Sequence, residues 1–138
     1  MTRKEEREAV FALLFEREFK TGESAEEIFS ISSENRDIDA TENGYIKKVY
    51  FGVVENQDKI DELISGASNG WKVSRLSKST RTALRLCTYE MLFCEDIPAT
   101  VSINEALEIT KKFDEPKSRA FVNGVLNSIK NKLESNEQ

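Results

Sequence analysis

The fold of this chain is decided by residues 97–130, which read IPATVSINEALEITKKFDEPKSRAFVNGVLNSIK. They contain two segments with apolar residues at helical spacing, each preceded by a proline, which cannot continue a helix. Ser102 and Glu105 have the spacing of a capping box and predict the start of the first helix. Asp114 and Pro116 predict the start of the second helix. Its apolar stripe consists of Val122, Val125, Leu126, Ile129 and Leu133.

Helical patterns also cover the chain before this stretch. Capping-box spacings predict three further helix starts, at Thr2 with Glu5, Ser24 with Glu27, and Asp39 with Glu42. The first of these helices should end at Gly22, and the segment from 45 to 66 fits either one helix or two with a break near Asn56. Residues 79–94 are the most apolar and predict a central buried helix. We therefore expect an all-α fold, a compact helical bundle of about six or seven helices in a single domain over residues 1–138.

The composition excludes several functional classes. The 138 residues include no histidine, which removes the commonest general base and the usual nitrogen ligand of zinc. No phosphate-binding loop, dinucleotide fingerprint or metal-ligand spacing is present, so we expect neither catalysis nor a cofactor. Cys87 and Cys94 lie about 10 Å apart along a helix, which is too far for a disulfide.

The same features predict a cellular location. The apolar runs are too short to span a membrane, and the N-terminal MTRKEERE lacks the apolar core of a secretory signal. Two free thiols agree with a reducing compartment. We therefore expect a cytoplasmic protein that does not enter a membrane.

Charge is distributed unevenly along the chain. The net charge is −5, and residues 21–70 alone contain eleven acidic and four basic residues. Residues 71–89 contain no acid and five bases, namely Lys72, Arg75, Lys78, Arg81 and Arg85. This stripe is a candidate surface for nucleic-acid phosphates, and a solvated helix face is the alternative. Arg85 lies deep in the apolar segment, so we expect it to pair with a carboxylate such as Glu90 or Glu105.

Three further features have two interpretations each. Arg3 and Arg7 share a helix face on which, with Lys4, they could hold phosphates, although the interleaved glutamates also fit a solvated face. Trp71 follows an Asn-Gly turn signal and could stack on a base, but a core anchor is the favoured interpretation. Gly124 costs about 1 kcal/mol relative to alanine inside a helix, which predicts a close helix crossing.

Several segments of the chain have the pattern of a known family. They are REAVFALLF at 7–15, the region 71–75, ALRLCTYEM at 83–91, DIP at 96–98, SINEALEITKKF at 102–113 and RAFVNGVLNSIK at 119–130. Together they cover essentially the whole chain and resemble the NusB family of bacterial transcription antitermination factors. It implies an all-α fold of two subdomains and no catalytic residues. It also implies binding of boxA RNA in nascent ribosomal RNA transcripts, together with the ribosomal protein NusE, to modify an elongating RNA polymerase. The oligomeric state is left open between a monomer and a homodimer.

The resemblance also implies particular site residues. The basic N-terminal segment of the family falls on Arg3, Lys4 and Arg7, which are therefore expected to bind RNA. A second RNA contact is expected in the segment before FVNG, at Lys117, Ser118, Arg119 and Phe121. Partner contacts are expected at Phe15 and Thr80.

The sequence departs from the family pattern in two places. Three acids dilute the N-terminal bases, which predicts that RNA affinity depends more strongly on the partner. Thr80 stands where the family usually has an acidic residue, so that part of the partner interface should differ.

Two other functions are alternatives to antitermination. A helical protein-interaction module without an RNA role is favoured by the net charge, whereas an RNA methyltransferase is excluded because 138 residues leave no room for its cofactor-binding domain.

Overall fold

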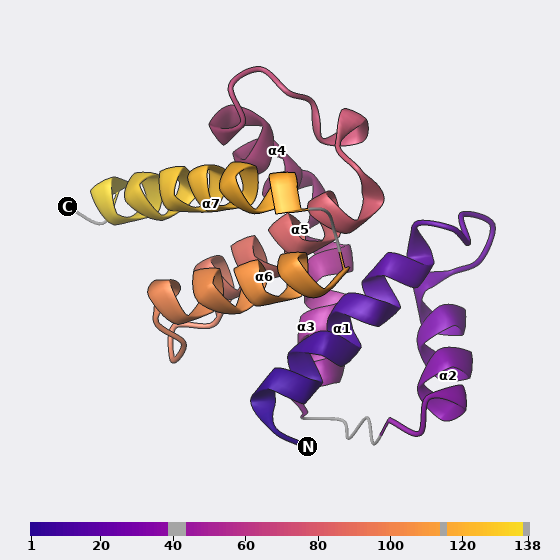
Figure 1. Ribbon diagram of the computed structural model, residues 1–138. Helices are drawn as coiled ribbons and strands as arrows, with labels where there is room; N and C mark the ends of the chain where they lie inside the picture. Colours follow the sequence, from indigo (N-terminus) through magenta and orange to yellow (C-terminus); the bar gives the residue numbers. More distant parts are fainter. Residues whose placement is uncertain (39–43, 114–115, 137–138) are drawn as a thin grey trace. The chain divides into compact units, whose positions relative to one another are not determined.

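The first helix begins where the sequence predicts it (Figure 1). In the computed structural model, which describes residues 1–38, 44–113 and 116–136, α1 spans Arg3–Arg17. The Thr2 hydroxyl accepts a hydrogen bond from the Glu5 N–H at 3.1 Å, and the Glu5 carboxylate accepts one from the Thr2 N–H at 2.9 Å. The predicted capping box is therefore confirmed.

The end of α1 differs from the prediction. The helix ends at Arg17 rather than at Gly22. Beyond it, the N–H groups of Glu18 and Phe19 donate to the carbonyls of Phe15 and Glu16, so the last turn is tightened to three-residue spacing. The side chain of Phe19, which lies in this last turn, is exposed.

The residues from Met1 to Glu55 form one compact unit of three helices. In it, α1 packs against both α2 (Ala25–Asn35) and α3 (Tyr45–Glu55). The Ser24 hydroxyl caps α2 as predicted, because it accepts a hydrogen bond from the Glu27 N–H at 3.1 Å. The predicted start at Asp39 and Glu42 lies outside the described residues. The buried apolar side chains of the three helices include Val10, Leu13, Leu14, Ile28, Phe29, Ile46, Val49, Tyr50 and Val53.

The residues from Asn56 to Gln138 form the second unit. Its elements are α4 (Gln57–Ala67), the short 3-10 helix η1 (Val73–Arg75), α5 (Lys78–Phe93), α6 (Ala99–Phe113) and α7 (Pro116–Asn136). The segment from 45 to 66, which fits either one helix or two in the sequence, therefore forms two helices, α3 and α4, with the break at Asn56. The described part of the chain contains seven α-helices and no strand, which confirms the expected all-α class with two subdomains.

The central helix of the second unit is α5 (Figure 1). It contacts α4, α6 and α7, and its Leu84, Leu86 and Cys87 are buried. This confirms the prediction from its apolar sequence. Cys87 and Cys94 are buried thiols that are not joined by a disulfide, as expected. Within the described residues, no helix combines the length and the apolar character that a membrane span needs.

The start of α6 corrects the prediction for Ser102. The helix begins at Ala99, and the Pro98 carbonyl accepts hydrogen bonds from the N–H groups of Val101 at 3.0 Å and Ser102 at 3.2 Å. Ser102 is therefore inside the helix, where it is buried and donates to the Glu90 carboxyl at 2.7 Å. The capping-box prediction is wrong because this serine belongs to the buried face of α6, where Ile103 and Ala106 also lie.

The C-terminal helix confirms one prediction and corrects another. Pro116 is the first residue of α7, as expected, whereas Asp114 lies outside the described residues. Val122, Val125, Leu126 and Ile129 form the buried stripe. A β-carbon added at Gly124, however, would meet no atom within 4 Å. The predicted close helix crossing at this glycine is therefore wrong.

Candidate nucleic-acid interface

The loop between α4 and α5 presents an aromatic ring to solvent. Asn69 and Gly70 adopt positive φ angles of 50° and 88°, so the predicted turn is confirmed, and Gly70 suits a backbone that L side chains rarely adopt. The buried Ser68 hydroxyl lies 2.8 Å from the carbonyl oxygens of both Ile64 and Trp71 and shares its one proton between them. Trp71 is 55% exposed. The core-anchor prediction is wrong because Ser68 holds the turn and leaves the indole outside.

A groove begins at this exposed ring. It has a volume of about 320 Å³ and is lined by Trp71, Arg75, Leu76, Ser77, Thr80, Lys117, Ser118 and Phe121. A second hollow of about 330 Å³ is lined by Asn69, Gly70, Trp71, Lys72 and Arg75. We call the first of these the Trp71–Phe121 groove. Trp71 and Arg75 line both hollows, so the groove and the hollow share one wall.

The start of α5 and the start of α7 both contribute to the groove. Ser77 is the N-cap of α5, and its hydroxyl accepts a hydrogen bond from the Thr80 N–H at 3.2 Å. Lys117 and Ser118 belong to the first turn of α7. Helix N-termini carry unsatisfied N–H groups and a partial positive charge, which favour anions. Two helix starts therefore add to the positive character of the groove.

The lining of the groove suits nucleic acid better than a metal or a catalytic reaction. Among the residues that the structure describes, it combines two cations, two aromatic rings and three hydroxyl groups, and no carboxylate lines it. Cations bind phosphates, and exposed aromatic rings stack on unpaired bases. Across the described ranges, no group of three or more cysteine, aspartate and glutamate residues is arranged to hold a metal ion.

The basic stripe over residues 72–85 divides into structural and exposed members. Arg85 donates from Nε to Asp61 Oδ1 at 2.8 Å and from Nη2 to Asp61 Oδ2 at 2.9 Å. The expected carboxylate partner is therefore present, and Asp61 on α4 supplies it. Arg81 donates to the carbonyls of Ser74 and Leu76, each at 3.4 Å.

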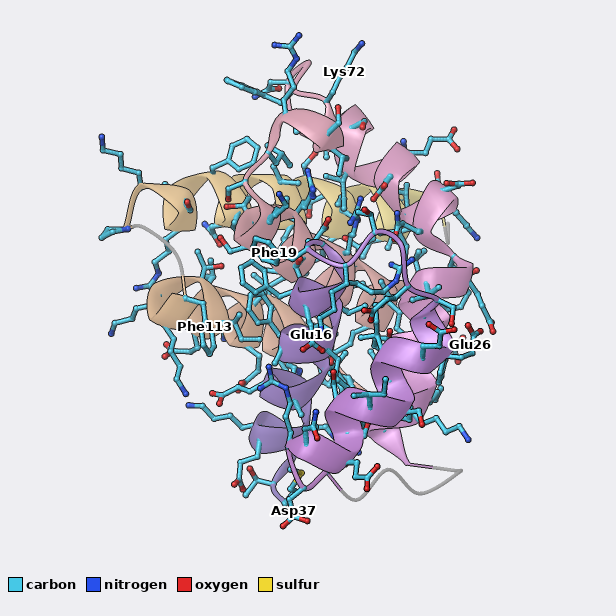
Figure 2. All side chains as sticks on the ribbon, turned by 90° about the vertical axis from the view of Figure 1, so that its right-hand side faces the viewer. Glu16, Phe19, Glu26, Asp37, Lys72 and Phe113 are labelled. Carbon is cyan, nitrogen blue, oxygen red and sulfur yellow. The ribbon has the colours of Figure 1, made fainter. Side chains whose placement is uncertain are left out.

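Lys72, Arg75 and Lys78 are the exposed members of the stripe, and the first two line the hollows. Lys72 and Arg75 are exposed, and neither pairs with a carboxylate of the residues that the structure describes. In Figure 2, Lys72 extends away from the ribbon at the edge of the molecule. The stripe is therefore neither one continuous phosphate surface nor one solvated face.

Four of the residues expected from the resemblance meet at the groove. Thr80, Lys117, Ser118 and Phe121 all line it, although they come from two helices. Arg119 is exposed in the first turns of α7 but does not line the groove. Sequence reasoning missed Leu76 and Ser77 and misjudged Trp71. The absence of acid over residues 71–89 was the signal that pointed to this segment.

The three basic residues of α1 have different surroundings. The guanidinium carbon of Arg3 lies 4.4 Å from the ring centre of Tyr45, and that of Arg7 lies 5.8 Å from the same ring. Arg3 also pairs with Glu6 at 3.4 Å, and Arg7 is only 4% exposed. The two arginines share a face, as predicted, but that face meets an aromatic ring of α3. Lys4 is exposed.

Phe15 lies in a row of rings along α1. Its ring centre is 5.8 Å from that of Phe11, in a stacked arrangement, and 5.1 Å from that of Phe19, edge to face. Phe19 is labelled in Figure 2 and is 63% exposed, whereas Phe15 is half-buried. The row therefore runs from the core of the first unit to its surface.

Comparison with known proteins identifies the family. The profile of the NusB family matches residues 4–131. The chain belongs to the NusB family. A transcription antitermination protein NusB of Clostridium perfringens is 44% identical over 131 residues, which are 94% of this chain and 96% of that protein.

Solved structures of the NusB family have the same fold. The NusB structure of T. maritima is 38% identical, with a TM-score of 0.83, and the match covers 100% of this chain and 99% of that one. A crystal structure of antitermination factors NusB and NusE in complex with dsRNA is also similar, with 28% identity and a TM-score of 0.83. That match covers 94% of this chain and 96% of the other.

Proposed function

We propose that this chain is a non-enzymatic transcription antitermination factor that binds boxA RNA of nascent ribosomal RNA transcripts together with NusE. Bound in this way, it modifies an elongating RNA polymerase in the cytoplasm. The observation that carries the proposal is the Trp71–Phe121 groove, which gathers cations, aromatic rings and helix starts in a member of the NusB family. A family relative in complex with NusE and dsRNA supports both partners.

Each part of the groove has a role in RNA binding. Lys117 and Arg75 attract phosphates, and Arg119 extends the positive surface along α7. The Ser118 hydroxyl is suited to a phosphate or a ribose 2′-OH, which distinguishes RNA from DNA. Phe121 offers an aromatic ring to an unpaired base. Phosphate contacts position the RNA, and base contacts select its sequence.

The first unit supplies further contacts in this proposal. Lys4 and Arg3 bind RNA phosphates. Arg7, expected from the resemblance to bind RNA as well, is only 4% exposed beside the Tyr45 ring, so it adds positive charge to this face without contacting a phosphate directly. Phe15 contacts NusE through the ring row of α1, and Thr80 does so at the wall of the groove. The proposal treats residues 1–138 as one NusB-like domain in which both units are needed.

The test measures binding of boxA RNA with and without NusE over a series of salt concentrations. Alanine at both Lys117 and Arg119 should weaken binding and reduce the salt slope by roughly one for each phosphate that is no longer neutralised. Lys132→Ala is the matched control, because Lys132 is exposed near the other end of α7. Its affinity and slope should equal those of the unchanged protein.

Two results would contradict the proposal. A flat salt dependence with equal binding of scrambled RNA would remove the RNA role and favour the helical interaction module, which agrees with the net charge of −5. If NusE does not change the RNA affinity, NusE and RNA bind this chain independently, and the proposed joint binding is wrong. Replacing Arg3 and Lys4 by alanine then tests the first unit in the same assay.

A further inference from the structure

The family resemblance assigned no role to Trp71. It is the only tryptophan of the chain, it is 55% exposed, and it lines both hollows beside α5. Other rings such as Phe19 and Phe113 are exposed as well, so exposure alone does not mark a binding site. Trp71 differs from them because it lines two hollows that cations also line. Arg75 lines the same two hollows, and Lys72 lines the second.

We propose that Trp71 is a stacking platform for one unpaired nucleobase of the bound RNA, and that Lys72 and Arg75 hold the phosphates on either side of that base. The inference rests on the proposed RNA-binding function and adds a subsite to it. An indole ring stacks on any base through its π face, and a nearby cation fixes the backbone of the same nucleotide. Such a subsite needs a single-stranded segment, since bases in a duplex are already stacked.

The backbone that carries the indole is fixed before RNA arrives. The Trp71 N–H donates to the Ser68 carbonyl at 3.1 Å, and its carbonyl accepts from the Ser68 hydroxyl at 2.8 Å. The Arg75 N–H then donates to the Lys72 carbonyl at 2.9 Å, which holds the 3-10 turn. Only side-chain freedom remains to be lost on binding, so the entropy cost of ordering this subsite is small.

The charge around the ring selects RNA over an apolar protein segment. Trp71 is followed by a run of residues up to 89 that contains no acid, and two exposed cations lie within four residues of the ring. A protein partner that covered only the indole would leave Lys72 and Arg75 without counter-charges. Phosphates on both sides of a stacked base supply those charges.

The test uses the intrinsic fluorescence of the protein, because Trp71 is its only source of tryptophan signal. The full chain with NusE is titrated with a boxA-containing single strand and with the same sequence held in a duplex. Binding is followed separately by the anisotropy of a dye on the RNA. Stacking should quench the Trp71 emission on the single strand at the same concentration at which anisotropy rises.

Three variants separate stacking from charge. Trp71→Ala should weaken single-strand binding by about 5- to 100-fold with an unchanged salt slope, since stacking involves no counterion release. Trp71→Phe should recover part of that loss. Arg75→Ala should lower the slope by about 0.7. Phe93→Ala is the control, because Phe93 is exposed at the opposite end of α5 and does not line the groove.

The outcomes distinguish this inference from the proposed function. Anisotropy changes without quenching, together with an unchanged affinity of Trp71→Ala, would overturn the stacking subsite and leave RNA binding in place. No anisotropy change with any RNA would overturn the proposed function, and the subsite with it. Quenching that is equal on the single strand and the duplex would also overturn the subsite.

Discussion

The hydroxyl of Ser102 on α6 donates a hydrogen bond of 2.7 Å to Oε1 of Glu90 on α5, and each of these two residues is about 1% exposed. The bond joins two helices through a carboxyl group that water does not reach. Ser102→Ala removes the donor and leaves the carboxyl oxygen buried without it. We expect the free energy of unfolding to fall by about 1–3 kcal/mol, measured by urea denaturation.

Ser128→Ala is the control for this change, because Ser128 is exposed on α7. It should alter the free energy of unfolding by less than about 0.5 kcal/mol. Equal stability of the two variants would show that the bond between Ser102 and Glu90 contributes nothing net.

Gly124 offers a stabilising substitution. It is exposed within α7, and an added β-carbon would meet no atom within 4 Å. Alanine loses less conformational freedom in a helix than glycine does, so Gly124→Ala should raise the free energy of unfolding by about 1 kcal/mol. Thermal denaturation gives the comparison, and Gly70→Ala is the contrast. That variant should be less stable, because Gly70 has a φ of 88°.

Local helix signals were predictable from the sequence because they depend on neighbours in the chain. The caps at Thr2 and Ser24 and the start of α7 at Pro116 needed only side chains within one turn. The Ser102 prediction was wrong for a related reason. A serine three residues before a glutamate has the pattern of a cap, and only tertiary packing shows that it faces Glu90 on another helix.

The site was predictable only in part, because a groove joins residues far apart in the chain. The resemblance supplied Lys117, Ser118 and Phe121, and the structure adds Trp71 from a loop more than forty residues earlier. A tryptophan after a turn looks the same in a sequence whether its ring is buried or exposed. Its exposure follows from Ser68, whose hydrogen bonds no sequence pattern indicated.

Tyr50 should make stability depend on alkaline pH. Its phenol donates to the Ala25 carbonyl at 2.8 Å, and burial raises the pKa of Tyr50 to about 12 from its ordinary value of 10.0. The folded protein therefore keeps this proton to a higher pH than the unfolded chain does. The stabilisation is complete below about pH 10 and is lost as the pH rises toward about 12.

Tyr50→Phe isolates this effect. The variant lacks the phenol, so its free energy of unfolding should be about 1 kcal/mol lower at neutral pH and should lose less between about pH 10 and about pH 12. Urea denaturation at several pH values measures both quantities. Parallel loss of stability in the two proteins over that range would show that other groups cause it.

Arg85 and Arg75 belong to the same basic stripe but should respond differently to alanine. Arg85 makes two parallel hydrogen bonds to Asp61, and its side chain is 13% exposed. Arg85→Ala leaves Asp61 without these donors and should lower the free energy of unfolding by about 1–3 kcal/mol. Arg85→Lys should recover only part of the lost free energy of unfolding, since an ammonium group cannot form the two parallel hydrogen bonds.

Arg75→Ala is the complementary change in this pair. Arg75 is exposed and has no carboxylate partner among the described residues, so its loss should change stability by less than about 0.5 kcal/mol. RNA affinity should nevertheless fall, because Arg75 lines the groove. Urea denaturation and RNA anisotropy on both variants separate the two roles. A destabilised Arg75→Ala protein, or an unaffected Arg85→Ala protein, would contradict this division of the stripe.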